Sequence, residues 1–135
     1  MPKFGSKSRR ELGGVHEDLQ ALFNEAIKYV DLTIIEGQRS LERQTQLKAE
    51  GKTKTLKGKH LEGLAVDVAP YDSKVRGIDW KKRENFIYMG GFIMGLAKRM
   101  GIPLRWGGDW NGLVKGQIEL YDNNFDDLVH FELDF

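Results

Sequence analysis

The chain has 135 residues, the length of one domain that can bury a core without disulfides or a structural metal. Lys plus Arg (21) nearly balance Asp plus Glu (20), so the formal net charge of +1 gives no reason to expect nucleic acid as a partner. There is no cysteine, which excludes disulfides and thiolate chemistry.

The N-terminal residues MPKFGSKSRREL carry charges with no apolar run after them, so we expect no secretory signal peptide. No stretch of the chain approaches the roughly 18 apolar residues that a membrane span needs. If the substrate lies outside the cytoplasm, another factor must deliver the protein to it.

The first half of the chain predicts two helices and two strands. Apolar residues recur every three or four positions over residues 12–30, which predicts an amphipathic helix. Residues 32–37, LTIIEG, have the branched side chains of a short strand. Ser40 is expected to cap a helix that reaches residue 50, and residues 64–69 predict a second strand. The basic residues 52–59 between them are expected to form a loop.

The second half predicts one long helix and two further strands. Asp79 is expected to cap a helix over residues 80–100, with Gly101 just past its end. Residues 104–106 and 128–133 are the remaining strand candidates. Between them lies a long, glycine-rich and polar loop, a feature that is often functional in a small domain. The whole chain is therefore expected to form a single α+β domain, residues 1–135.

Asp67 lies in the apolar stretch LAVDVA of the second strand. Alternation along a strand places Val66 and Val68 on one face and Asp67 on the other. An ionised carboxylate in such a place needs a partner, because an unpaired buried charge is too costly to keep. A metal ion and a salt bridge to a basic residue both meet this need, and for Asp67 taken alone the salt bridge is favoured.

Two histidines make the metal the stronger interpretation. His60 lies seven residues before Asp67, and Gly63 between them allows the chain to turn. His130 lies in the last apolar strand. Two imidazole nitrogens and one carboxylate oxygen, with no fourth protein ligand, are typical of a catalytic zinc that keeps one position for water. A lone histidine is more often a surface or core residue, so each residue alone is a weak signal.

A catalytic zinc lowers the pKa of its bound water to about 7, and a nearby carboxylate must then accept the proton. Asp127, three residues before His130, is the candidate for this base. Asp126 is a rival candidate for the base, but it lies four residues before His130 and fits the three-residue spacing less well. Glu132 is a second rival, which shares a strand face with His130 and would instead orient it.

Three motifs together resemble a known family. HLEGLAVD resembles the H-x-x-G-x-A-x-D signature of zinc-dependent peptidases that include D-alanyl-D-alanine dipeptidases and carboxypeptidases (VanX- and VanY-like) and phage L-alanyl-D-glutamate endolysins. EGQRS with Gln44 resembles the upstream G-x-R-S-x-x-x-Q segment, and DLVH resembles the acid-x-x-His segment. LRWGGDW is similar to the segment before the last motif in the phage branch.

The resemblance implies a Hedgehog/DD-peptidase-like fold, a small antiparallel sheet with flanking helices. It implies that His60, Asp67 and His130 bind Zn²⁺, that Asp127 is the base and that Arg39 faces the substrate. The residue-level alternative for Arg39 is a surface position or a structural ion pair with an acidic residue such as Glu36.

One departure from the family is Gly58, which stands where relatives often carry a substrate-contacting serine. Thr53 or Thr55 would have to substitute, or the contact is absent. The aromatic residues Trp106, Trp110 and Tyr121 either wall the cleft or pack in the core and loop. The acidic residues Glu119, Asp122, Asp126 and Asp127 either bind a second cation or, with Asp127 as the exception, belong to a solvated loop beside the zinc site.

The function implied is a zinc peptidase that cuts the L-alanyl-D-glutamate bond of bacterial peptidoglycan as a phage endolysin. The protein is expected to be a monomer, made in the host cytoplasm and released to the wall by a separate membrane-permeabilising protein. The alternatives are a D-alanyl-D-alanine carboxypeptidase or dipeptidase of the same fold, and a non-catalytic, zinc-stabilised wall-binding domain.

Overall fold

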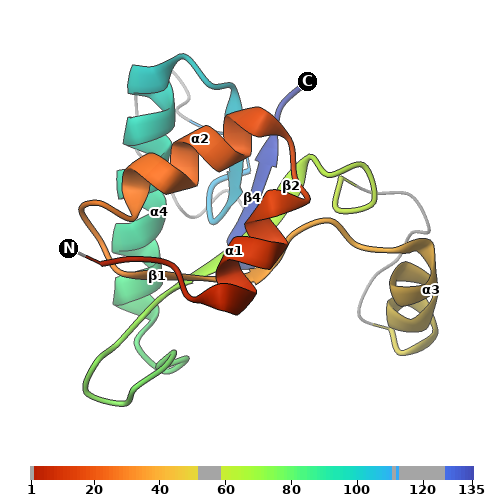
Figure 1. Ribbon diagram of the computed structural model, residues 1–135, viewed down its shortest axis with the longest axis horizontal. Helices are drawn as coiled ribbons and strands as arrows, with labels where there is room; N and C mark the ends of the chain where they lie inside the picture. The colour runs from red at the N-terminus through yellow and green to blue at the C-terminus, as the bar shows by residue number, and fades with distance from the viewer. Residues whose placement is uncertain (1, 52–58, 111, 113–126) are drawn as a thin grey trace.

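The computed structural model describes residues 2–51, 59–110, 112 and 127–135 (Figure 1). Eight helices and strands lie in these ranges. In chain order they are α1 (Ser6–Gly13), α2 (Glu17–Ala26), β1 (Leu32–Glu36), α3 (Leu41–Ala49), β2 (Ala65–Pro70), α4 (Arg83–Met100), β3 (Leu104–Gly107) and β4 (Asp127–Leu133). All four predicted strands are present, each within two residues of its expected bounds.

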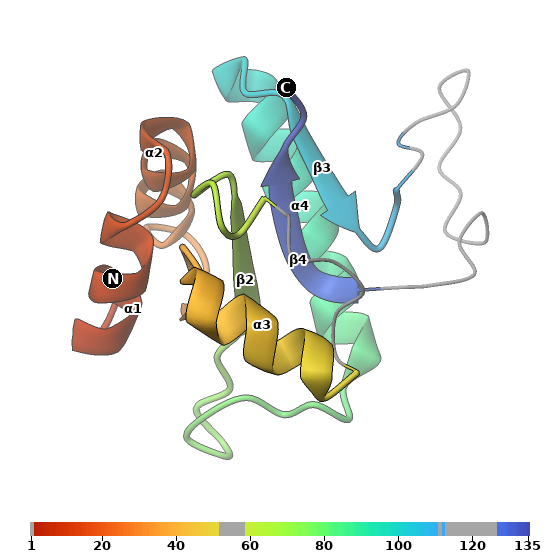
Figure 2. The same cartoon turned by 90° about the vertical axis from the view of Figure 1, so that its right-hand side faces the viewer.

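The strands form one sheet in the order β1-β2-β4-β3, and every neighbouring pair is antiparallel. The expected small antiparallel sheet with flanking helices is therefore confirmed. Helix α4 contacts β2, β3 and β4, and α1 contacts β1. Figure 2 shows α4 behind the sheet and α3 in front of it, so one face of the sheet is covered by α4 and the opposite face looks toward α3.

The core lies between the sheet and helices α2 and α4. Val66 and Phe131, which are paired across β2 and β4, are fully buried there. Phe131 meets Phe23 of α2 edge to face and stacks on Trp106 of β3. Because side chains alternate along a strand, the neighbours of these residues in β2 and β4 point to the face opposite α4. That face carries Asp67 and His130.

The single helix predicted over residues 12–30 is wrong, because only α2 lies within this region and a separate helix, α1, ends at its start. Helix α1 ends at Gly13, and α2 begins at Glu17. The pair Gly13 and Gly14 weakens a continuous helix, and His16 then caps α2, its Nδ1 accepting a hydrogen bond from the Asp18 backbone N–H at 3.0 Å. The spacing of the apolar residues correctly predicted which side chains are buried, since both helices bury their apolar side against the same core.

Helix α4 begins at Arg83 rather than at residue 80, with Lys82 in the N-cap position. Asp79 instead accepts a hydrogen bond from the Lys81 backbone N–H at 3.1 Å, within a turn that precedes the helix. Gly101, at φ 73°, ends the helix as expected. Within the described ranges, no helix is both long and apolar enough to cross a membrane.

Candidate metal centre

Asp67 and His130 lie directly opposite each other on the paired strands β2 and β4. Side chains of directly opposed residues in antiparallel strands share a face and come within contact distance. Here His130 Nδ1 lies 3.2 Å from Asp67 Oδ1. The pairing of these strands therefore brings together two of the predicted ligands that are 63 residues apart in the chain.

His60 joins this pair from the segment that leads into β2. Its Nε2 lies 3.1 Å from the same Asp67 Oδ1, and its side chain is only 7% exposed. The turn that returns the chain to β2 contains Gly63 at φ 71°, a conformation that favours glycine. Within this turn the Leu64 backbone N–H donates to the Lys59 carbonyl at 2.7 Å. The expected role of Gly63 as the turning point is confirmed.

The orientation of the His60 ring is set by a backbone carbonyl. His60 Nδ1 lies 2.8 Å from the Gly37 carbonyl oxygen, which only accepts hydrogen bonds. Nδ1 must therefore carry the proton, and the lone pair of Nε2 faces Asp67. Nothing in the sequence pointed to Gly37 in this role, because every residue offers a carbonyl and only the fold selects one.

The three side chains have the spacing and chemistry of a metal site. The ligand atoms of His60, Asp67 and His130 all lie within 4.8 Å of one another. Ligands bound to zinc at 2.0–2.1 Å with tetrahedral geometry are about 3.3 Å apart, close to the two N···O distances of 3.1 and 3.2 Å. Two imidazole nitrogens favour zinc over calcium or magnesium, which take oxygen ligands. The residues therefore fit a zinc ion.

Charges within the cluster support one another. Burial opposes ionisation of Asp67, but its contacts with the rings of His130 and His60 outweigh it and hold the pKa of the Asp67 carboxyl far below its usual range. Burial also opposes protonation of His130, but its contacts with Asp67 and Glu132 prevail and raise the pKa of His130 to about 9. The close contacts of His130 with two carboxylates therefore favour its charged form.

Asp127 lies at the start of β4, where the strand is irregular. Residues three apart in a regular strand, such as Asp127 and His130, face opposite sides. The register between β3 and β4 shifts between Trp106 and Gly107, which interrupts this alternation. Trp106 Nε1–H donates to the Leu128 carbonyl at 2.8 Å within the irregular stretch.

The environment of Asp127 suits a proton acceptor. Burial raises the pKa of the Asp127 carboxyl, and the negative charge of Asp67 raises it further. The charges of His130, His60 and Arg39 act in the opposite direction. All four groups therefore lie close enough to interact with Asp127, which is placed beside the cluster.

Arg39 forms an ion pair with Glu36, the structural role that the sequence left open for it. Its Nε and Nη2 donate to the two carboxylate oxygens of Glu36, at 2.9 and 3.1 Å. Glu36 is paired with Asp67 across β1 and β2, and the Arg39 backbone N–H donates to the His60 carbonyl at 2.8 Å. The ion pair therefore fixes the guanidinium next to the candidate ligands, and its charge acts on Asp127.

Of the aromatic residues that could wall the cleft or pack in the core, Trp106 packs in the core and Trp110 lies near the cluster. Trp106 is a core residue, 3% exposed and stacked on Phe131. The Trp110 ring lies 5.6 Å from the His130 ring and forms part of the surroundings of the cluster. Seven of the positions considered in the sequence lie outside the described residues: Thr53, Thr55, Gly58, Glu119, Tyr121, Asp122 and Asp126. The side chain of Gln44 is also not described.

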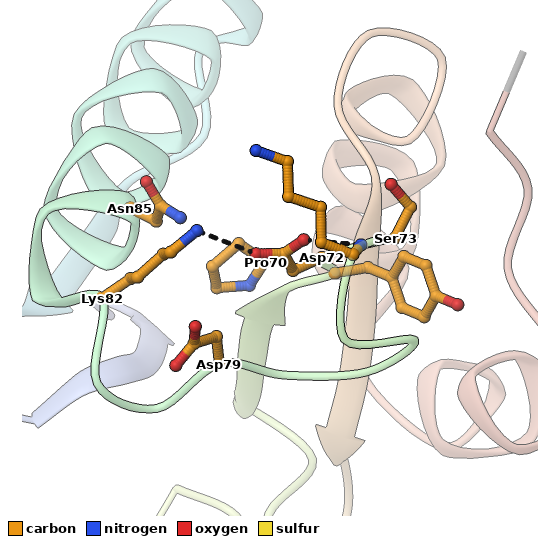
Figure 3. Close-up of a pocket in the computed structure, with 8 residues that line it drawn as sticks. Pro70, Asp72, Ser73, Asp79, Lys82 and Asn85 are labelled. Atoms are coloured by element: carbon orange, nitrogen blue, oxygen red, sulfur yellow. Dashed lines mark hydrogen bonds and ion pairs between the residues drawn. The ribbon is translucent and has the colours of Figure 1, made fainter.

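A separate pocket of about 260 Å³ lies where β2 ends and α4 begins (Figure 3). Its lining is polar and includes the ion pair between Asp72 and Lys82, at 3.3 Å, together with Asp79 and Asn85. None of the three candidate ligands and neither Asp127 nor Arg39 lines it. This pocket is therefore separate from the cluster.

The chain is similar to known peptidases over nearly its whole length. The family model for the phage L-alanyl-D-glutamate peptidase matches residues 1–134. The L-alanyl-D-glutamate peptidase of Escherichia phage T5 is 36% identical over 130 residues, which cover 92% of this chain and 93% of the relative. The crystal structure of the L-Ala D-Glu endopeptidase ChiX of Serratia marcescens aligns with a TM-score of 0.77 and 29% identity, over 98% of this chain and 91% of that one. The chain therefore belongs to the phage L-alanyl-D-glutamate peptidase family.

Proposed function

We propose that the protein is a zinc-dependent peptidase that hydrolyses the L-alanyl-D-glutamate bond in the stem peptides of bacterial peptidoglycan. The observation that carries the proposal is the meeting of His60, Asp67 and His130 within 4.8 Å, with Asp127 beside them. The names of the phage T5 relative and of ChiX support the choice of bond.

Zinc, when held by these three side chains, would act as a Lewis acid and lower the pKa of a bound water to about 7. The chain's own residues would perform the proton transfers. Asp127 accepts a proton from the attacking water and passes it to the nitrogen of the leaving D-glutamate. The raised pKa of Asp127 supports this role, because a base whose pKa lies nearer to the working pH also returns the proton more readily.

Arg39 would stabilise negative charge on the substrate. Its guanidinium is always charged and offers a planar set of donors that suits a carboxylate or the oxyanion that develops during attack on the amide. The bidentate pairing with Glu36 supports this role by holding the guanidinium in one orientation, so little freedom is lost on binding.

Product analysis tests the proposal. Zinc-loaded protein is incubated with defined muropeptides, and the products are identified by mass spectrometry. We expect a peptide that begins with D-glutamate and a glycan fragment that retains L-alanine. Free alanine or dialanine would instead establish the D-alanyl-D-alanine exopeptidase, and an inert zinc-loaded protein would establish the non-catalytic wall-binding domain. A chelator-treated sample is the control.

We further propose that the chain acts as a monomeric catalytic domain, residues 1–135. In this proposal it is made in the host cytoplasm and degrades the wall after a separate protein has permeabilised the membrane. Peptidoglycan is then its macromolecular partner.

A further inference from the structure

We propose that Glu132 is a positioning residue for the metal centre, which selects the ring tautomer of His130 and holds the ring in its ligating orientation. This inference rests on the proposed function, because it assumes that His130 binds the metal. The evidence is the set of contacts that Glu132 makes on both of its carboxylate oxygens.

The two histidines of the cluster are held in the same way but by different groups. Each ring has one nitrogen near Asp67 and the other near an acceptor on the far side. For His60 that acceptor is the Gly37 carbonyl, at 2.8 Å from Nδ1. For His130 it is Glu132 Oε1, at 2.9 Å from Nε2.

The acceptor decides which ring nitrogen is available to a metal. An ionised carboxylate only accepts hydrogen bonds, so Glu132 requires a proton on Nε2 of His130. In the neutral ring, the lone pair then belongs to Nδ1, the nitrogen that lies 3.2 Å from Asp67 Oδ1. Without Glu132, the other tautomer would place the proton on Nδ1, where it would block the metal.

The Glu132 carboxylate is itself held from two sides. Its Oε2 lies 3.4 Å from Lys59 Nζ and 3.8 Å from Arg105 Nη1. Arg105 is paired with Glu132 across β3 and β4, so the sheet places them side by side. The Glu132 side chain is 12% exposed, which limits its freedom to turn toward solvent. One oxygen is thus left to face His130.

Lys59 links the histidine on β4 to the segment that carries the first ligand. It directly precedes His60, and its Nζ also donates to the Leu133 carbonyl. The ion pair between Lys59 and Glu132 therefore connects the positions of His60 and His130 without passing through the metal. The sequence placed Glu132 near His130 but gave no sign of Lys59 or Arg105, whose contacts arise from the turn and from strand pairing.

The test measures zinc affinity in three variants. Glu132→Ala removes the acceptor. Glu132→Gln keeps an amide oxygen for Nε2–H but turns an amide NH₂ toward two cations. Glu62→Gln, at an exposed position near the same turn, removes one negative charge without touching the cluster and is the matched control. Dissociation constants are measured by competition with a chromophoric chelator at a temperature at which all variants are folded.

We expect Glu132→Ala to weaken zinc binding by about 10- to 100-fold, Glu132→Gln to weaken it less, and Glu62→Gln to leave it unchanged. The absorption spectrum of the Co²⁺-loaded protein should also change in Glu132→Ala, because the ring of His130 is no longer fixed. If both Glu132 variants bind zinc as tightly as the wild type and only lose thermal stability, Glu132 is merely structural and the inference is overturned. A wild-type protein that binds no zinc would instead overturn the proposed function.

Discussion

Replacing Gly90 by alanine tests how the core positions the proposed base. A Cβ added to Gly90 in α4 would lie 2.1 Å from Cζ2 of Trp106, far inside the 3.4–4 Å of ordinary van der Waals contact. The ring has little room to yield, because it is 3% exposed, stacks on Phe131 and donates to the Leu128 carbonyl. Either the helix or the indole must move.

The expected magnitude follows from three contributions. Overpacking a core costs about 1–3 kcal/mol, and the loss of the hydrogen bond to Leu128 costs about 1 kcal/mol more. Alanine in a helix interior offsets about 1 kcal/mol. We therefore expect Gly90→Ala to lower the free energy of unfolding by about 1–3 kcal/mol. The melting temperature should fall by about 4 °C for each kcal/mol.

Gly91→Ala is the matched control in the same helix, since among the described residues no atom beyond its chain neighbours and the adjacent helix backbone lies within 4 Å of its added Cβ. It should stabilise the protein by up to about 1 kcal/mol, through helix propensity alone. Calorimetry and urea titration measure both variants. At temperatures where Gly90→Ala remains folded, its kcat should also fall, because the indole of Trp106 anchors the strand start that carries Asp127. Equal stability changes in the two variants would refute this account of the packing.

Three further predictions concern the cluster itself. Asp127→Asn should lower kcat by about 10²- to 10⁴-fold while zinc affinity measured by chelator competition stays within a few-fold of wild type, and near-normal turnover would rule out Asp127 as the base. Arg39→Lys should lower kcat/KM because a lysine cannot reproduce the bidentate pairing with Glu36, and unchanged steady-state kinetics would exclude a role for the guanidinium. The contacts of His130 raise its pKa in the folded protein to about 9, against an ordinary value of 6.5. The charged ring therefore stabilises the metal-free protein fully below pH 6.5, and this stabilisation is lost as the pH rises through 9. Urea titrations should therefore show a loss of about 3 kcal/mol over that window, and a flat profile would contradict the pairing of His130 with two carboxylates.

Local sequence patterns predicted β1 and β2 well because each is a largely apolar run bounded by a turn residue, Gly37 for β1 and Pro70 for β2. They failed at residues 12–30, where apolar spacing continues across Gly13 and Gly14 although the backbone does not stay helical. Helix propensity and the cap at His16 decided the break. Periodicity alone reports which residues are buried, and two short helices can bury the same positions as one long helix.

The candidate ligands were predicted by residue type and motif, but their partners were not. His60, Asp67 and His130 are chemically distinctive in an apolar setting. The Gly37 carbonyl and Lys59 are ordinary groups that acquire a role only through the turn before β2 and the pairing of the strands. The position of Asp127 likewise depends on a register shift, a feature of strand pairing that a single strand's sequence does not encode.

The central claim is that His60, Asp67 and His130 bind one zinc ion together. A crystal of the zinc-loaded protein, with anomalous diffraction recorded on both sides of the zinc absorption edge, tests it most directly. We predict one anomalous peak at about 2.0–2.2 Å from Nε2 of His60, a carboxylate oxygen of Asp67 and Nδ1 of His130. A peak bound by other residues, or no peak in protein that still cleaves muropeptides, would contradict the claim.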